Sequence, residues 1–241
     1  MGVCLAVACL AQAQTSNPTL KIPPVKTSFN PEGQPVEITA WGAVSAAPSG
    51  VFRLALTVDL GNFQEHLTPV LAAQLNRSDR CGERLSVERA VLTPAAPSAL
   101  LTANVHYERY ACAKAFGKEI VKRLAGGNGV VEVNLTPSIT ENRIALAAEV
   151  RKIDADGSLG ELLRSGSLGD SIRDKIAASI ESAIQRSANL KSTLPAEVEN
   201  AAAIQTVQFA DGGSGRLWLT ISGAVRLSVE QFRDVARKLA R

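Results

Sequence analysis

Four isoleucines recur at intervals of four residues in the C-terminal third of the chain, and no other pattern constrains the fold as strongly. They are Ile172, Ile176, Ile180 and Ile184. At 3.6 residues per turn, this spacing places them along one face of a helix. Asp170 can cap the start of that helix, and Pro195 follows its end. The pattern predicts a helix over residues 170–194, which needs a partner for its apolar face.

Segments in which apolar and polar residues alternate lie on both sides of this predicted helix. Such alternation is typical of strands with one buried and one solvated face. It covers residues 36–44, 51–60, 85–92, 100–110, 131–135, 144–150, 204–209 and 217–225. Because tight turns join most neighbouring strands, the sheet should be antiparallel. We therefore expect an α+β fold, with a highly curved antiparallel sheet wrapped around the long helix.

Additional shorter helices are expected where apolar residues recur at three- and four-residue spacing. These segments are residues 63–75, 114–124 and 228–239. Glycines at 126–129 should end the second helix, and Ser228 with Gln231 forms a capping box for the third.

The first 50 residues divide into two parts. Residues 1–13 are apolar and then small, and Ala11 and Ala13 fit a signal-peptidase site before Gln14. We interpret them as a cleaved signal peptide of a periplasmic protein; a retained anchor and lipidation at Cys9 are the alternatives. Residues 14–50 hold seven prolines or glycines before Pro48 and predict a Pro-rich linker and N-terminal extension. Residues 51–241 then form one α+β domain.

Two cysteines remain after removal of the signal peptide, Cys81 and Cys112. Two alternating segments lie between them, with a turn at residues 94–98. A hairpin folded at that turn brings the cysteines opposite one another, which predicts a disulfide in an oxidising compartment. The alternative is two free buried thiols. The inward face of the hairpin should carry Leu85, Val87, Val91, Leu101, Ala103, Val105 and Tyr107.

The charge distribution and the motifs exclude several classes of function. The net charge is only +3, and no basic run is interleaved with aromatic residues, which argues against nucleic-acid binding. His66 and His106 lack the spacing of a metal site and are interpreted as solvated surface residues. No serine lies in a Gly-x-Ser-x-Gly motif. We expect a non-enzymatic protein with no cofactor, no metal and no transmembrane span.

The succession of short hairpins, the helix at 170–194 and the closing hairpin at 204–227 resembles the tubular lipid-binding (TULIP) superfamily, most closely its bacterial envelope members. The resemblance covers residues 52–241 and is one of pattern, without a shared motif. It implies a highly curved sheet around a long helix, with an apolar tunnel for acyl chains between them. Candidate lining residues are Ile172, Ile176, Ile180, Ile184, Leu54, Leu56, Val58, Leu146, Leu219 and Ile221.

The resemblance implies a periplasmic binding or carrier protein for a lipid or another long apolar ligand. On the residues alone, a hollow core and a filled core fit equally well. The alternative function is therefore a structural or interaction module of the cell envelope with a filled core, which would bind envelope proteins. A hydrolase with scattered catalytic residues is a third hypothesis.

Overall fold

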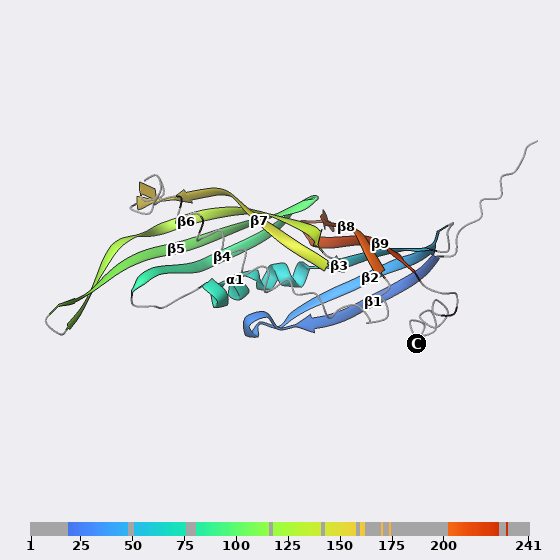
Figure 1. Ribbon diagram of the computed structural model, residues 1–241, viewed down its shortest axis with the longest axis horizontal. Coiled ribbons are helices and arrows are strands. Elements are labelled where there is room, and N and C mark those ends of the chain that lie inside the picture. Colours follow the sequence, from blue (N-terminus) through green and yellow to red (C-terminus); the bar gives the residue numbers. More distant parts are fainter. Residues whose placement is uncertain are drawn as a thin grey trace, which may run out of the picture.

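The computed structural model describes residues 19–47, 51–75, 81–115, 118–140, 143–157 and 202–226, with residues 160, 161, 170, 174 and 230 in addition. Strands make up 74% of them. The strands form two sheets, and every strand pairing that the structure describes is antiparallel. The molecule is elongated, with the sheets side by side along its length (Figure 1).

The first sheet has five strands in the order β1-β2-β3-β9-β8. Its strands are β1 (Thr19–Phe29), β2 (Val36–Ala46), β3 (Phe52–Asp59), β8 (Ala202–Asp211) and β9 (Leu217–Val225), and a 3₁₀ turn, η1 (Pro31–Gly33), joins β1 to β2. β8 and β9 form the closing hairpin that the sequence predicted at residues 204–227. Three strands from the N-terminal part and two from the C-terminal part thus share one sheet.

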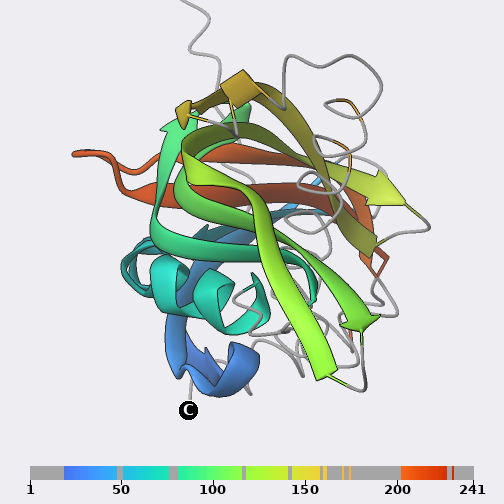
Figure 2. The same ribbon diagram turned by 90° about the vertical axis from the view of Figure 1, so that its left-hand side faces the viewer.

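The second sheet has four strands in the order β4-β5-β6-β7, joined by consecutive hairpins. They are β4 (Gly82–Ala95), β5 (Ser98–Ala115), β6 (Lys118–Thr140) and β7 (Arg143–Ala155), and the helix α1 (Gly61–Leu75) lies alongside β4. In the view along the long axis, this sheet curves around α1, and β8 and β9 run across behind it (Figure 2).

One face of the four-stranded sheet is apolar because every second residue is apolar. Leu101, Ala103 and Val105 on β5 are at most 2% exposed, whereas Thr102 and Asn104 between them face outward. The apolar face packs against α1, where Leu67 and Leu71 are buried, and against inner residues of β2, β8 and β9. Each fully buried leucine or valine contributes roughly 1.5–3 kcal/mol. One core therefore spans both sheets.

The edge of β4 is covered by polar side chains of α1. The Thr68 hydroxyl accepts a hydrogen bond from the N–H of Ala90 (2.9 Å) and lies 3.1 Å from the carbonyl oxygen of the same residue. Gln64 reaches further: its Nε2 donates to the carbonyl of Leu92 at 2.7 Å, and its Oε1 accepts from the N–H of Leu217 at 2.8 Å. Gln64 thereby joins β4 of one sheet to β9 of the other.

The expected architecture of a curved sheet wrapped around a long helix is wrong for the described chain. Two antiparallel sheets replace the single sheet, and α1, with 15 residues, is the longest helix with described bounds. The apolar face that the long helix was expected to cover is instead covered by α1 and by the second sheet. Apart from Asp170 and Asp174, the predicted helix at 170–194 lies outside the described residues, as does most of the one at 228–239.

The prediction of a short helix at residues 114–124 is also wrong. The described residues of this segment, 114–115 and 118–124, end β5 and begin β6, with Cys112 opposite Val121 and Ala113 opposite Ile120. The four-residue spacing of Phe116, Ile120 and Leu124 suggested a helix. Ile120 and Val121 are β-branched and pair with β5, which favours a strand. Periodicity alone does not distinguish a short helix from a strand.

The predicted inward face of β4 is wrong after Val87, because β4 contains a β-bulge. The register shifts between Val87 and Arg89, so that Ala90 and Leu92 are buried and Val91 is 39% exposed. An extra residue in one strand reverses which side chains face the core after it.

Residues 19–46 form a hairpin, of which the sequence predicted the second strand, at residues 36–44, but not the first. Pro23 and Pro24 lie at the irregularity between Ile22 and Val25, on the edge strand β1. A proline at an edge removes no hydrogen bond from the sheet, so it is tolerated there. Both strands of the hairpin belong to the five-stranded sheet, because β2 pairs with β3.

The predicted disulfide is confirmed: Cys81 is bonded to Cys112, with Cα atoms 5.7 Å apart. The turn of the β4–β5 hairpin lies between Ala95 and Ser98, where the sequence placed it. The bond closes the open end of that hairpin, 31 residues apart in sequence.

Replacing both Cys81 and Cys112 by serine should lower the free energy of unfolding by roughly 3–4 kcal/mol, because the unfolded chain regains the entropy of an open loop. Denaturant unfolding with and without reductant measures the effect. Reductant should destabilise the wild type and leave the double variant unchanged. A wild type that is insensitive to reductant would contradict the bond.

Thr68→Val should lower the free energy of unfolding by roughly 1–3 kcal/mol, because it leaves the backbone N–H of Ala90 without its acceptor at nearly unchanged side-chain volume. The matched control is Thr102→Val on the outer face of β5, expected within about 0.5 kcal/mol of the wild type. Equal losses in both variants would show that α1 does not hold the β4 edge through Thr68.

Candidate functional site

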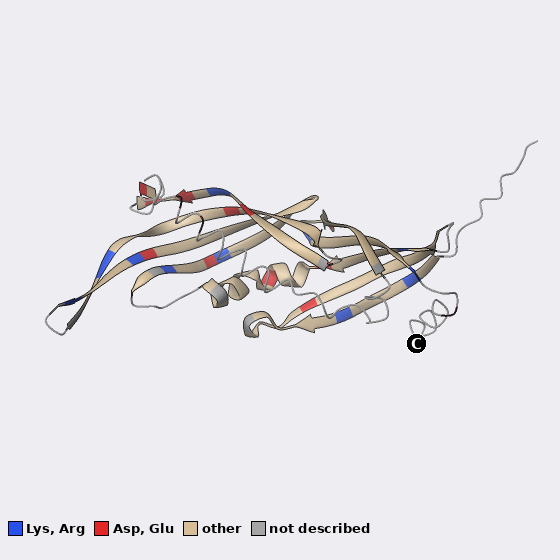
Figure 3. Cartoon of the chain, viewed as in Figure 1, with Lys and Arg blue, Asp and Glu red and all other residues tan. Residues whose placement is uncertain are grey.

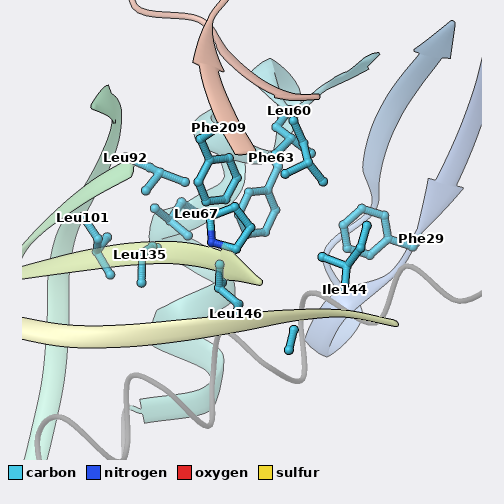
Figure 4. Close-up of a pocket in the computed structure, with 13 residues that line it drawn as sticks. Phe29, Leu60, Phe63, Leu67, Leu92, Leu101, Leu135, Ile144, Leu146 and Phe209 are labelled. Carbon is cyan, nitrogen blue, oxygen red and sulfur yellow. The ribbon is translucent and has the colours of Figure 1, made fainter. Parts of the chain in front are cut away.

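An apolar cavity of about 70 Å³ lies where the two sheets and α1 meet (Figure 4). Seven strands and α1 contribute to its wall. The lining residues are Phe29, Leu60, Phe63, Leu67, Leu92, Leu101, Leu135, Pro137, Ile144, Ala145, Leu146, Phe209 and Leu219.

The lining side chains reach the cavity because of strand and helix periodicity. Phe63 and Leu67 are four residues apart and share one face of α1. Leu135 and Pro137 are two apart and share the inner face of β6. Phe29 on β1 lies beside Phe63, with ring centroids 6.4 Å apart. Segments from residue 29 to residue 219 thus converge on one space.

No charged side chain lines the cavity among the described residues. A cavity with this wall offers few hydrogen-bond partners to water, and such cavities tend to stay dry. It also offers no acid, base or nucleophile to a substrate. The arrangement is suited to the contact of a hydrocarbon group.

The structure brings together some of the predicted lining residues and separates others. Leu146 and Leu219 line the cavity. Val58 belongs to the main core, and Leu54 and Leu56 form a smaller cluster with Val44 and Val225. Ile221 packs against both clusters. Ile172, Ile176, Ile180 and Ile184 lie outside the described residues.

Most of the wall was not anticipated from the sequence. One signal was present: the chain has six phenylalanines, and Phe29, Phe63 and Phe209 all line this cavity. The scarcity of aromatic residues makes their convergence informative. No periodicity identifies Phe29, because the prolines before and after it predict a linker.

A second cluster of side chains surrounds Glu108 on the outer face of the four-stranded sheet. Tyr110 donates a hydrogen bond to Glu108 Oε2 at 3.0 Å. Arg123 Nε lies 3.3 Å and His106 Nε2 lies 3.6 Å from Oε1, and Arg84 Nη1 lies 3.9 Å from Oε2. The Arg84 guanidinium also lies 4.3 Å above the Tyr110 ring centre.

These neighbours lower the pKa of Glu108. The hydrogen bond from Tyr110 has the largest effect; partial burial opposes it, and Arg123 and His106 lower the pKa further. His106 is held from its other side, with Nδ1 2.5 Å from Asn128 Oδ1. Both ring nitrogens therefore face fixed partners, and neither faces a nucleophile. The cluster links β4, β5 and β6 through side chains on the outer face of the sheet.

The described part of the chain has no metal cluster and no membrane-spanning helix. No group of three or more His, Cys, Asp or Glu side chains there could hold a metal ion. His66 contacts the carbonyl of Asn62 at 2.9 Å within α1. Among the same residues, no helix has the length and apolarity needed to cross a bilayer.

Comparison with known proteins adds no assignment. No protein-family model matches the chain, and no curated protein matches it in sequence. The resemblance to the TULIP superfamily therefore stays a prediction.

Replacing Glu108 with glutamine should destabilise the protein near about pH 7 and much less in acid. Because the pKa of Glu108 is lower in the folded state, its carboxylate stabilises the protein at pH values above 4.5, the ordinary pKa of the group. That contribution is lost as the pH falls through the lowered pKa. Denaturant unfolding of wild type and variant across this range measures the difference.

The matched control for this prediction is Glu149→Gln, which changes an exposed glutamate on β7. Its stability difference from the wild type should be small, because the side chain is exposed. A Glu108→Gln difference that is constant from neutral to acid pH would contradict the role of the carboxylate charge.

Proposed function

We propose that this chain is an exported, non-enzymatic binding protein for a lipid or another long apolar ligand. The observation that carries the proposal is the cavity between the sheets, whose described wall is apolar throughout. The disulfide supports export, since such bonds persist in oxidising compartments. A periplasmic location with removal of residues 1–13 is part of the proposal.

The size of the cavity determines which part of a ligand it holds. A volume of about 70 Å³ leaves room for roughly five water-sized groups. It suits the end of a hydrocarbon chain rather than a whole lipid. Each buried CH₂ contributes roughly 0.8 kcal/mol, so affinity should rise with chain length until the space is filled. With few donors in the wall, the head group should matter little.

A second candidate function is the envelope module with a filled core. The observation that favours it is the packing around the cavity: Leu67, Leu101, Leu135 and Leu219 are at most 3% exposed and already belong to the main core. In that case the cavity is an ordinary packing defect, and the chain acts through its surface. Ligand binding separates the two candidates.

Leu146→Trp should abolish binding of a fluorescent fatty-acid probe, because the indole fills the space that Leu146 borders from β7. The matched control is Ala147→Trp, the next residue on the same strand, which is exposed. It should bind the probe as the wild type does. Displacement of the probe by phospholipids of increasing chain length then gives the selectivity.

Two results would overturn the proposal in favour of the filled-core module. One is a folded wild type that neither binds the probe nor yields lipid on solvent extraction and mass spectrometry. The other is equal probe binding by Leu146→Trp and the wild type, which would place the probe elsewhere on the molecule.

A further inference from the structure

The β5–β6 hairpin extends beyond the rest of its sheet. Pairing of β4 with β5 begins at Gly82 and Tyr110, and pairing of β6 with β7 reaches only Gly129. Residues 111–115 of β5 pair only with residues 118–122 of β6 in the described chain; at their base, Tyr110 pairs with both Gly82 and Arg123, and Leu124 lies at the register shift. We call these residues the arm. Its six paired positions on β5 span roughly 20 Å, and it forms one end of the molecule (Figure 1).

The arm combines exposed apolar side chains with positive charge. Ile120, Val121 and Leu124 are 54%, 39% and 56% exposed, and they are three of the six large exposed apolar residues in the described chain. Residues 110–124 contain four lysines or arginines and one glutamate, a net charge of +3 that equals the net charge of the whole chain. Bands of basic residues mark this end of the molecule (Figure 3).

The base of the arm is held in place from two sides. Cys112 on the arm is bonded to Cys81 at the start of β4. Tyr110 and Arg123, paired across the two strands, both contact Glu108. A two-stranded ribbon alone is marginally stable, so these contacts give the arm a fixed direction.

We propose that the arm docks the protein onto a lipid surface that carries negative charge. Apolar side chains beside lysines and arginines suit the boundary between acyl chains and anionic head groups. The aliphatic part of a lysine side chain can lie along the apolar layer while its ammonium group contacts lipid phosphates. This inference does not require the cavity to hold a ligand.

Charge complementarity favours a lipid surface over a second copy of the chain. Two arms paired edge to edge would place +3 against +3, and lysines on edge strands oppose such pairing. An acidic protein surface would satisfy the charges alone, whereas an anionic lipid surface also offers acyl chains to Ile120, Val121 and Leu124.

Flotation of the full chain with lipid vesicles tests the proposal. The chain should float with vesicles of phosphatidylglycerol and phosphatidylcholine in equal parts and stay behind with phosphatidylcholine alone. Binding should weaken as salt is added, because exposed charges are screened.

Lys114→Gln with Lys122→Gln should reduce binding to the mixed vesicles about 25-fold, since each basic residue near an anionic surface contributes about fivefold. The matched control is Lys21→Gln with Arg53→Gln, two exposed cations of the five-stranded sheet, which should bind as the wild type does.

Ile120→Ser with Leu124→Ser should reduce binding to the mixed vesicles roughly tenfold. Its control is Val25→Ser, which is 50% exposed on β1.

Thermal unfolding midpoints equal to that of the wild type would show that the variants fold. Lys122→Gln alone should still reduce binding to the mixed vesicles about fivefold. Three results would overturn the proposal: a wild type that does not float with mixed vesicles at low salt, arm variants that bind as tightly as their controls, or dimers that the arm substitutions dissociate. The last would assign the arm to a second copy. Vesicle binding that survives Leu146→Trp separates docking from ligand binding in the cavity.

Discussion

The hydrogen bonds of Gln64 fix how the two sheets meet. One side-chain amide donates to the carbonyl of Leu92 on β4 and accepts from the N–H of Leu217 on β9. The second sheet is tied to the first at another point, where the N–H of Phe209 donates to the carbonyl of Pro97 at 2.8 Å. Sheets with one apolar face must bury that face against something. These directional bonds determine which residues of the opposite sheet supply the cover.

The cavity follows from this arrangement. Side chains of the two sheets and α1 fill most of the space between them, and Leu67, Leu101 and Leu217 are almost fully buried. The space that remains borders Phe29, Phe63 and Phe209, whose rigid rings fill an irregular gap less completely than flexible side chains would. The same contacts that stabilise the core thus define a space in which an apolar group can be held.

The free edges of the two sheets are protected in different ways. Thr68 and Gln64 of α1 occupy the edge of β4, and Pro23 and Pro24 interrupt β1. The arm has no such cover in the described chain; instead it carries lysines and exposed apolar residues. Its firm anchoring through Cys112 indicates a fixed structural element. An anchored extension without cover among the described residues is the feature on which the proposed docking to a lipid surface rests.

The sequence by itself determined the strands of the four-stranded sheet near the core, the turn at residues 94–98 and the pairing of Cys81 with Cys112. Alternation and turn chemistry act between residues close in sequence, so both can be recognised without the tertiary structure. It could not decide between helix and strand at residues 114–124, where the spacing of Ile120 and Leu124 fits both. Pairing with β5 decided that, as the bulge before Ala90 decided which face of β4 is buried. The cover of the apolar face and the wall of the cavity depend on contacts between residues far apart in sequence. Such contacts leave no local periodicity, so only the tertiary structure could show them.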